Sequence, residues 1–391
     1  MGSKSKKSDE SGKRIEPMKI LLLGDLNSIH LIKWVLALQT KAKEIAVFSL
    51  ATIEHTHFDN IENITIKSVS LNNSIFRTGE GSIKKLSYLN ALPQLKTFIQ
   101  TFNPDILHAH YASSYGLLGA LTKFNPFVIS VWGSDIFDFP NKNFIFKQIV
   151  KYTLEQADLI LSTSKVMAVE TKKHTDKDVI VTPFGVDMDV FKKTTPVETN
   201  QEVINIGTVK ALEPKYGIDT LIEAFAIADN RVQANLTLQI VGSGGLLEEL
   251  MLLCTQLNIE NKVHFLGKLD NSQIPGKLNE FQIYVALSKW DSESFGVAIV
   301  EAQSCEVPVI VSDKGGLPEV VSQDETGLIV PANDSESAAK AMIKLIENPA
   351  LRSQMGKSGR LRVKKHFDWD KNVAHMHQIY KDLLASFKKA K

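Results

Sequence analysis

The sequence predicts an α/β protein built from two doubly wound domains, each a parallel sheet with helices on both faces. From Met18 onward, short and almost continuously apolar runs alternate with longer amphipathic runs. This alternation is typical of parallel strands that are covered on both sides. The chain has 391 residues, which is too long for one ordinary compact domain and sufficient for two. Hydrophobic residues make up 43% of the chain, so both domains can bury a core.

The first seventeen residues do not share this pattern. Met1 and Ile15 are the only large apolar residues within 1–17, so the segment lacks the apolar core of a signal peptide. An N-myristoylation motif would need Ser or Thr where Lys6 stands. We interpret residues 1–17 as a disordered leader or an added tail.

The first domain is expected to span residues 18–187. Its apolar runs predict strands, and the amphipathic runs between them predict helices. We expect strands at 20–24, 45–50, 64–69, 106–109, 127–131, 159–162 and 179–182. We expect helices at 29–40, 83–101, 113–123, 143–156 and 164–173.

The second domain, residues 188–366, restarts the alternation after a polar linker at 191–200. Strands are predicted at 203–206, 236–241, 263–266, 283–286, 307–311 and 327–330, and helices at 216–228, 246–257 and 295–304. The helical tail is longer than this sheet needs, so we expect residues 367–391 to form a helix that crosses back to the first domain. Two such domains on a short linker would form a cleft at the carboxyl ends of their strands, where α/β folds bind ligands.

Composition excludes several classes of protein. Lysine and arginine number 45 against 44 aspartates and glutamates, so a strongly basic nucleic-acid binder is excluded and no nucleic-acid partner is expected. No apolar run approaches the ~18 residues of a membrane span. The only cysteines, Cys254 and Cys305, lie far apart, which indicates reduced thiols in a cytoplasmic setting and cannot by itself make a zinc site.

Residues 83–89 raise the alternative of peripheral membrane contact. Lys84 and Lys85 stand beside the apolar residues Ile83, Leu86 and Leu89, a pattern that could hold the protein at the inner face of a membrane. An ordinary amphipathic surface helix explains the same pattern and is the favoured interpretation.

The most informative stretch of the second domain is 290–302. Glu293 and Glu301 lie eight positions apart, which on a helix means about 80° in azimuth and ~12 Å along the axis. Such a pair alone is typical of a solvated helix surface. Here, however, Glu293 stands at the start of the helix and Glu301 lies inside an apolar run, where a carboxylate is costly to bury without a partner. The amino end of this helix also suits an anion.

Two glycine-containing loops agree with an anion site. Lys210 and Lys215 follow the strand 203–206, where they are placed to neutralise phosphate charge, although surface lysines would show the same pattern. Gly315-Gly316-Leu-Pro-Glu319 offers a second helix start. The loop Gly242-Ser-Gly244 lacks the dinucleotide spacing Gly-x-Gly-x-x-Gly, which disfavours an oxidoreductase.

Taken in order, these motifs resemble one family. The series comprises Lys215-x-Gly, Gly242-Ser-Gly244, Val263-x-Phe-Leu-Gly267, Glu293-Ser-Phe-Gly-x(4)-Glu301-Ala, Pro308-Val, Gly315-Gly-x-Pro-Glu319 and Glu325-Thr-Gly-Leu328. It resembles the retaining glycosyltransferases of family 4, glycosyl transferases group 1. The likeness covers residues 18–391, densely in the second domain and thinly in the first. It implies the GT-B fold, in which two Rossmann-like domains face each other across a cleft.

The resemblance assigns roles in the second domain. Lys215 matches the family lysine at the donor diphosphate and is taken as catalytic, and Lys210 stands where an arginine is usual, which keeps the charge but loses the bidentate fork. Glu293 matches the catalytic glutamate that touches the transferred sugar, and Glu301 matches the one that holds the ribose. Lys268 and Leu269 would lie near the base, and Gly207 is also assigned to donor binding. The backbone of Ser294, Phe295, Gly296 and Val297 would face sugar and phosphate.

In the first domain, the run Asp105-Ile-Leu-His108-Ala-His110 puts two histidines on one face of a strand. His110 matches the catalytic histidine of the family, although a hydrogen-bonded strand residue would give the same pattern. Trp132 and Asp135 resemble a loop of the same cleft, and 183–191 matches the interdomain hinge.

The chain departs from the family pattern at two places. Asp25, Asn27 and Ser28 stand where many members have paired glycines, so we assign these three residues to the acceptor side or the cleft. We expect acceptor recognition around 25–30, 72–84 and 111–115. Glu306 replaces a glycine that usually ends the helix after Glu301, which would be mildly strained in a left-handed conformation.

The function implied by the resemblance is transfer of a sugar, with retention, from a nucleoside-diphosphate sugar to a hydroxyl acceptor in glycan, polysaccharide or glycolipid biosynthesis. UDP is the preferred nucleotide and GDP the alternative. No cofactor and no metal are expected, because the two lysines and the helix amino ends at 294–297 and 316–319 would stabilise the leaving diphosphate. A non-catalytic sugar-nucleotide-binding subunit and a GT-B-like epimerase or phosphorylase are the alternatives. The sequence carries no signal for the acceptor or the oligomeric state.

Overall fold

The computed structural model describes residues 18–53, 57–69, 83–194 and 203–390. The leader at 1–17, most of the expected acceptor segment 72–84 and the side chains of Lys84 and Lys85 lie outside this description, so the expectations for them stay expectations. The chain forms two compact units. The first runs up to Thr182 and includes the residues from Val373 onward, and the second is Pro183–Asn372.

The first unit is built on a parallel sheet of seven strands among the described residues, in the order β3-β2-β1-β4-β5-β6-β7. The strands are β1 (Lys19–Leu23), β2 (Glu44–Ser49), β3 (Ile64–Ser68), β4 (Ile106–His110), β5 (Phe127–Val131), β6 (Leu159–Ser162) and β7 (Val179–Val181). The helical elements are α1 (Ile29–Leu38), η1 (Ile83–Ala91), α3 (Leu92–Phe102), α4 (Tyr115–Thr122), α5 (Ser134–Phe137), η2 (Phe139–Asn141), α6 (Phe144–Gln156) and α7 (Lys165–Lys172).

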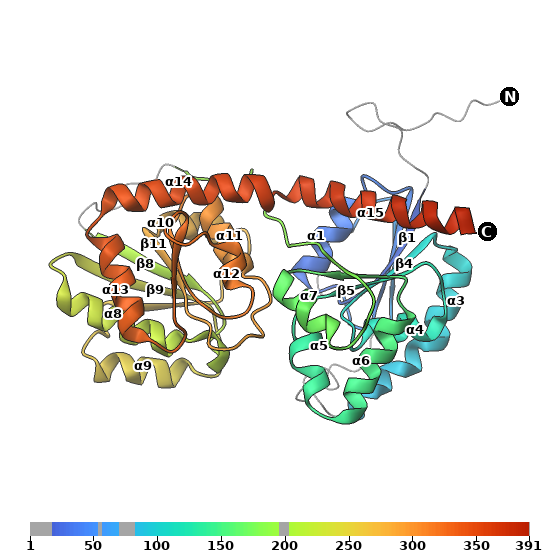
Figure 1. The fold of residues 1–391 in the computed structure, drawn as a ribbon, viewed down its shortest axis with the longest axis horizontal. Coiled ribbons are helices and arrows are strands. Elements are labelled where there is room, and N and C mark those ends of the chain that lie inside the picture. Colours follow the sequence, from blue (N-terminus) through green and yellow to red (C-terminus); the bar gives the residue numbers. More distant parts are fainter. Residues whose placement is uncertain (1–17, 54–56, 70–82, 195–202, 391) are drawn as a thin grey trace. The chain divides into compact units, whose positions relative to one another are not determined.

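The second unit repeats this plan with a six-stranded parallel sheet in the order β10-β9-β8-β11-β12-β13, again for the described residues. Its strands are β8 (Val203–Val209), β9 (Asn235–Val241), β10 (Val263–Gly267), β11 (Ile283–Ala286), β12 (Val309–Ser312) and β13 (Gly327–Val330). Its helical elements are η3 (Pro214–Tyr216), α8 (Ile218–Arg231), α9 (Leu247–Gln256), α10 (Ile274–Glu280), α11 (Val297–Ser304), α12 (Leu317–Val320), α13 (Ser335–Ile346) and α14 (Pro349–His366). Helices lie on both faces of each sheet (Figure 1).

The strand order reverses once in each sheet, between β1 and β4 in the first and between β8 and β11 in the second. Central strands such as β4 and β11 are buried along their whole length, which explains their continuous apolar runs. In open α/β sheets, the crevice outside the carboxyl ends of the strands at the reversal is the preferred place for a ligand. The loops after β1, β4, β8 and β11 are therefore the expected ligand-binding positions.

The last helix, α15 (Trp369–Ala390), begins in the second unit, and its residues from Val373 onward belong to the first. Its Tyr380 is fully buried. The long helical tail consists of three helices, α13, α14 and α15.

The predicted elements agree with the observed ones except where short or irregular segments occur. The helix expected at 83–101 is divided into the 3₁₀ segment η1 and α3, whose first turn contains Pro93. The short helices α5 and α10 were not predicted, because four and seven residues are too few for a helical period to show. Glu306 does adopt the left-handed conformation, with φ +60°.

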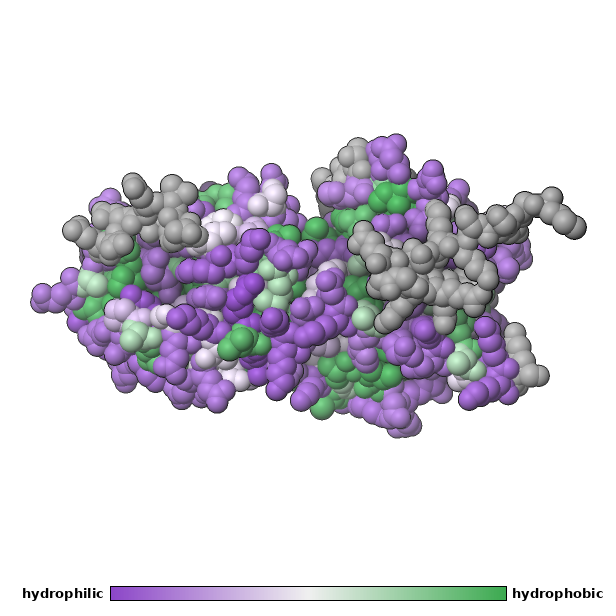
Figure 2. All heavy atoms as spheres, turned by 90° about the horizontal axis from the view of Figure 1, so that it is seen from above, coloured by the Kyte–Doolittle hydropathy of each residue, from purple (hydrophilic) through white to green (hydrophobic). Residues whose placement is uncertain are grey.

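None of the described helices is both long enough and apolar enough to cross a lipid bilayer. On the face drawn in Figure 2, hydrophilic side chains predominate and hydrophobic ones form separate small patches.

Candidate active site

Lys210 and Glu293 form the ion pair at the centre of the candidate site. Lys210 follows β8 and Glu293 lies between β11 and α11, so both come from the carboxyl edge of the sheet beside the strand-order reversal. Lys210 Nζ donates to Glu293 Oε2 at 2.6 Å, and the two side chains keep only 10% and 14% of their surface exposed. Two residues predicted for the donor site are thus in direct contact.

Both members of the pair stay charged at neutral pH. Burial acts to lower the pKa of Lys210, but the neighbouring Glu293 carboxylate outweighs it and the pKa is raised. Burial acts to raise the pKa of Glu293, but the charge and hydrogen bond of Lys210, with the hydroxyl of Ser288, hold it below its usual value.

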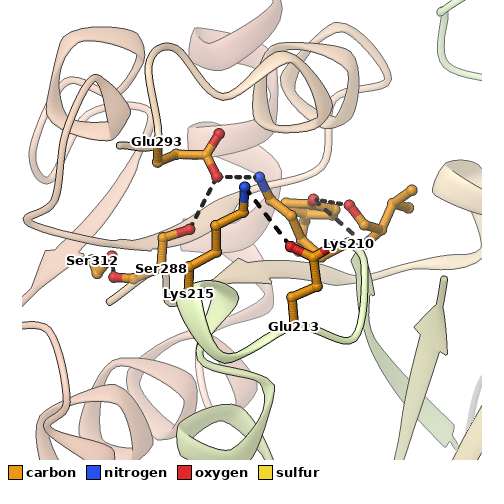
Figure 3. A network of polar contacts seen from close by, with 8 residues as sticks. Lys210, Glu213, Lys215, Ser288, Glu293 and Ser312 are labelled. Atoms are coloured by element: carbon orange, nitrogen blue, oxygen red, sulfur yellow. Dashed lines mark hydrogen bonds and ion pairs between the residues drawn. The ribbon is translucent and has the colours of Figure 1, made fainter. Parts of the chain in front are cut away.

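Ser288 is the second group that holds the carboxylate. It follows β11, and its hydroxyl donates to Glu293 Oε2 at 3.1 Å. The hydroxyl of Ser312, the last residue of β12, donates to the Ser288 carbonyl oxygen at 2.6 Å. Both serines are buried. Figure 3 shows Ser288 and Lys210 approaching the same oxygen of Glu293.

Lys215 joins this cluster from η3. Its Nζ lies 4.8 Å from the centre of the Tyr216 ring, and Lys210 Nζ lies at the same distance from that ring. An aromatic face attracts ammonium groups, so Tyr216 favours the approach of the two like charges. Glu213 Oε2 is 3.8 Å from Lys215 Nζ, but that carboxylate is half exposed. Two ammonium groups thus gather beside one largely buried carboxylate, Glu293, and one half-exposed carboxylate, Glu213.

Gly217 explains why a glycine stands two positions after Lys215. Its φ is +63°, and a Cβ at this position would overlap the carbonyl oxygen of Leu287. The Lys289 N–H also donates to the Lys215 carbonyl oxygen at 2.7 Å. The absence of a side chain therefore lets the Lys215 turn lie directly against the segment that carries Ser288.

Gly315 and Gly316 support the loop that carries Glu293. Gly315 has φ +52°, and a Cβ on it would overlap the Glu293 carbonyl oxygen. The Gly316 N–H donates to that same oxygen at 2.8 Å, and the Leu317 N–H donates to Lys314 O at 3.1 Å. The Glu319 N–H donates to Gly316 O at 3.1 Å, so the amides at 316–319 bond within the protein, which speaks against the expectation that this amino end faces phosphate, and the Gly316 amide braces the Glu293 loop.

Helix α11 begins at Val297, after Gly296, and no side chain caps it. The first N–H groups of a helix have no acceptor within it, so the backbone at the start of α11 is suited to bind an anion. The Phe295 side chain itself is buried against Phe184 and Phe367, with ring centres 5.9 and 5.5 Å away. Only its backbone could contact a ligand.

Glu301 lies further along α11, near Tyr284 of β11. Burial raises the pKa of Tyr284 to about 12, and the Glu301 carboxylate adds to this effect. The Tyr284 hydroxyl lies 3.4 Å from both backbone polar atoms of Val209, directly before Lys210. The second predicted glutamate is thus close to the residues around the Lys210–Glu293 pair.

The remaining predicted donor residues are Lys268, Leu269 and Gly207. Lys268 and Leu269 follow β10, one strand beyond β9, and Lys268 is exposed. Gly207 lies within β8, where a Cβ would overlap the ring of Phe281, so its small size serves packing. Its assignment to donor binding stays a prediction.

In the first unit, the two histidines of β4 have different environments. His108 Nδ1 lies 2.6 Å from the Tyr380 hydroxyl and His108 Nε2 lies 2.8 Å from Ser130 Oγ. His110 is buried, and neither of its ring nitrogens has a hydrogen-bond partner among the described residues. Its ring centre is 4.4 Å from that of His108 and 4.6 Å from that of Trp132. Burial lowers the pKa of His108 to about 3 and that of His110 well below its usual value, so both are neutral.

Asp135 organises the loops beside this strand. Its carboxylate accepts hydrogen bonds from the backbone N–H groups of Ala112, Trp132 and Gly133 at 2.8, 3.2 and 2.8 Å. It is 1% exposed, and burial raises its pKa despite these bonds. Asp135 therefore positions the backbone of these loops, and its assignment to the acceptor side or the cleft stays a prediction.

Asp25, Asn27 and Ser28 form the turn between β1 and α1. Asp25 Oδ1 accepts from the Asn27 N–H at 2.9 Å, and Asn27 Nδ2 donates to Thr52 O at 2.8 Å. The Ser28 N–H donates to Asp25 O at 3.0 Å. Side-chain hydrogen bonds thus close the turn that paired glycines would otherwise make.

Among the described residues, the sequence analysis missed Ser288, Ser312, Tyr216, Tyr284 and Tyr380. Ser288 could have been found, because it follows a predicted strand at the edge that carries Glu293. Tyr380 gives no local signal, since its partner His108 is 272 positions away.

Within the described ranges, no three His, Cys, Asp or Glu side chains are grouped so as to hold a metal ion.

Comparison with known proteins identifies the class. Residues 190–362 match the family model described as glycosyl transferases group 1, and residues 19–164 match the model described as glycosyl transferase 4-like. An uncharacterized glycosyltransferase of Methanocaldococcus jannaschii is 27% identical over 331 residues, which is 83% of this chain and 88% of that protein. The N-acetyl-alpha-D-glucosaminyl L-malate synthase of Bacillus anthracis is 29% identical over 315 residues, 75% of this chain and 78% of that protein.

Solved structures share the fold. A sucrose-phosphate synthase from Thermosynechococcus elongatus superposes with a TM-score of 0.76 at 21% identity, covering 94% of this chain and 100% of the other. An Anabaena protein solved in complex with UDP gives 0.77 at 20% identity, with the same coverage. Together with the site, these matches define a glycosyltransferase of the GT-B fold. The chain belongs to glycosyltransferase family 4, in the group 1 glycosyl transferases.

Proposed function

We propose that this glycosyltransferase uses a nucleoside-diphosphate sugar as donor, passes the sugar to a hydroxyl acceptor with retention of configuration, and needs no metal ion. The observation that carries the proposal is the convergence of Lys210 and Lys215 beside Glu293 at the carboxyl edge of the second sheet. A diphosphate is the group that such paired ammonium ions, next to a helix amino end, are suited to bind.

The proposed chemistry breaks the bond between the anomeric carbon and the diphosphate oxygen, and negative charge develops on the leaving group. The two lysines and the first amides of α11 would stabilise this charge. The acceptor oxygen forms the new bond to the anomeric carbon on the same face, and its proton passes to the departing phosphate. In this scheme Glu293 orients the sugar, and Glu301 holds the ribose.

We further propose UDP as the nucleotide, with GDP as the alternative. One relative, 32% identical over 203 residues, is a GDP-mannose-dependent mannosyltransferase of Corynebacterium glutamicum, so the guanine arm must be tested. We assign the enzyme to glycan, polysaccharide or glycolipid synthesis in the cytoplasm. Peripheral contact with the inner membrane face is the alternative location. The catalytic role of His110 stays a prediction that a His110→Ala variant tests.

The test is a calorimetric panel of UDP, GDP, ADP and their sugar conjugates, first without metal and then with magnesium. We expect one nucleotide to bind without metal and to lose affinity at least tenfold in Lys215→Ala. Lys193→Ala, an exposed lysine of the same unit, is the matched control and should bind like the wild type. If no nucleotide binds, the transferase proposal fails. Product analysis with and without acceptor then separates transfer from epimerisation and phosphorolysis.

A further inference from the structure

The carboxylate of Glu293 is held asymmetrically. Lys210 Nζ and Ser288 Oγ both donate to Oε2, at 2.6 and 3.1 Å. No described residue donates a hydrogen bond to Oε1, and this oxygen is not fully buried. Figure 3 shows this second oxygen pointing away from Lys210 and Ser288. One oxygen is therefore fixed by the protein, and the other is open to a ligand.

Ser288 lies at the edge of the sheet, directly after β11, which pairs with β12. Ser288 is 1% exposed and Ser312 is fully buried, and the Ser312 hydroxyl donates to the Ser288 carbonyl oxygen at 2.6 Å. Ser288 follows β11 and Ser312 ends β12, which is paired with β11 in parallel. The Ser288 hydroxyl thus comes from the rigid edge of the sheet, whereas Glu293 is carried by a loop.

Lys210 alone would leave the carboxylate free to rotate about a single contact. A second donor on the same oxygen, arriving from another strand, defines the plane of the carboxylate and the direction of Oε1. Hydrogen bonds to an ionised acceptor are also stronger than bonds between neutral groups. The geometry therefore separates two tasks: Oε2 anchors the side chain, and Oε1 accepts from the substrate.

We propose that Ser288 is a positioning residue that, with Lys210, fixes Glu293 Oε2 so that Oε1 accepts a hydrogen bond from a hydroxyl group of the donor sugar. The inference rests on the proposed donor class and goes beyond it by assigning each carboxylate oxygen a task. It predicts that Ser288 affects the binding of the sugar part of the donor and not the binding of its nucleotide part.

The test measures the affinity ratio of nucleoside diphosphate to nucleoside-diphosphate sugar as a function of pH, using UDP and UDP-glucose, or GDP and GDP-mannose if the guanine arm binds. The ratio is compared between wild type and variants at each pH, because the terminal phosphate of the free diphosphate titrates at about pH 6 in every sample and cancels in that comparison. In the wild type, the contribution of the sugar to affinity should be lost as pH falls and Glu293 is protonated. In Ser288→Ala, the loss should begin about 0.5–1 pH unit higher, because a hydrogen bond that favours the carboxylate is gone.

Ser312→Ala is the matched control. It removes a buried hydroxyl of the same size and one hydrogen bond to Ser288, but it leaves the Ser288–Glu293 bond in place. We expect its pH midpoint to equal that of the wild type. Ser288→Thr, which keeps the hydroxyl, should restore the midpoint, and thermal unfolding of each variant reports whether it is folded.

The outcomes are distinct. Equal midpoints in Ser288→Ala and Ser312→Ala would overturn the positioning role while leaving the donor proposal intact. A wild-type protein that binds no nucleotide would overturn the proposed function and this inference with it. A midpoint shift confined to Ser288→Ala and reversed in Ser288→Thr would establish the role.

Discussion

Lys210 Nζ and Glu293 Oε2 lie 2.6 Å apart although 83 positions separate the two residues in the chain. The contact exists because β8 and β11 are neighbours at the strand-order reversal of the second sheet. It joins the lysine loop and the glutamate loop in a largely buried pair.

Breaking this pair should cost stability. Glu293→Gln leaves the Lys210 ammonium buried without its counter-charge, and we expect a loss of about 3 kcal/mol. The double variant Lys210→Met with Glu293→Gln should recover most of that loss, because it removes both charges. Calorimetric unfolding of the single and double variants checks this, and additive losses would contradict the pairing.

The pair should also make stability depend on pH. The pKa of Glu293 is lower in the folded chain than its ordinary value of 4.5, so the unfolded chain binds the proton more tightly. The stabilisation is fully present above about pH 4.5 and is lost as pH falls through the folded pKa. The stability difference between wild type and the double variant should therefore be constant from pH 8 to 5 and change below it. A difference that varies across pH 5–8 would contradict this assignment.

Gly315→Ala should displace the Glu293 loop. A Cβ there would overlap the Glu293 carbonyl oxygen, and φ is +52°. We expect a loss of more than about 1 kcal/mol and weaker binding of the donor sugar. Gly276→Ala in α10, where no atom lies within 4 Å of the new Cβ, is the control and should be neutral or slightly stabilising. Equal unfolding temperatures for the two variants would argue against the bracing role of Gly315.

Tyr380→Phe should destabilise the first unit. The change leaves His108 Nδ1 buried without its partner, which costs about 1–2 kcal/mol. Tyr152→Phe, at a partly exposed ring in α6, serves as the control and should change little. Thermal unfolding measures both, and an unchanged Tyr380→Phe protein would show that the hydrogen bond contributes nothing net.

Metal removal should not affect donor binding. The positive charge for the diphosphate comes from Lys210 and Lys215 in the proposed mechanism, so prior treatment with EDTA should leave the affinity within twofold. A gain of tenfold or more on adding magnesium or manganese would refute metal independence.

The fold was largely predictable because its signal is local. Continuous apolar strands such as 283–286 and 159–162 were placed at their observed bounds. The charged residues Lys210, Lys215 and Glu293 were also predicted, through their place after strands and through the family motifs. The hydrogen bonds and ring contacts of these charged residues were not predicted, because Ser288 and Tyr216, and Ser312 behind Ser288, carry no charge pattern and act only through tertiary contact. The hydrogen bonds of Asp135 were not predicted for the same reason: the sequence shows a carboxylate at a loop and not the three backbone amides that donate to it.

The path of α15 bears on the order in which the chain acquires its structure during synthesis. The first unit needs residues from Val373 onward, including the Tyr380 hydroxyl that meets His108. When Thr182 has just left the ribosome, the first unit therefore still lacks the part of its core that the later residues supply. The second unit, Pro183–Asn372, is one continuous segment and can fold as soon as that segment has left the ribosome. The half of the enzyme that is translated first is the half that finishes folding last.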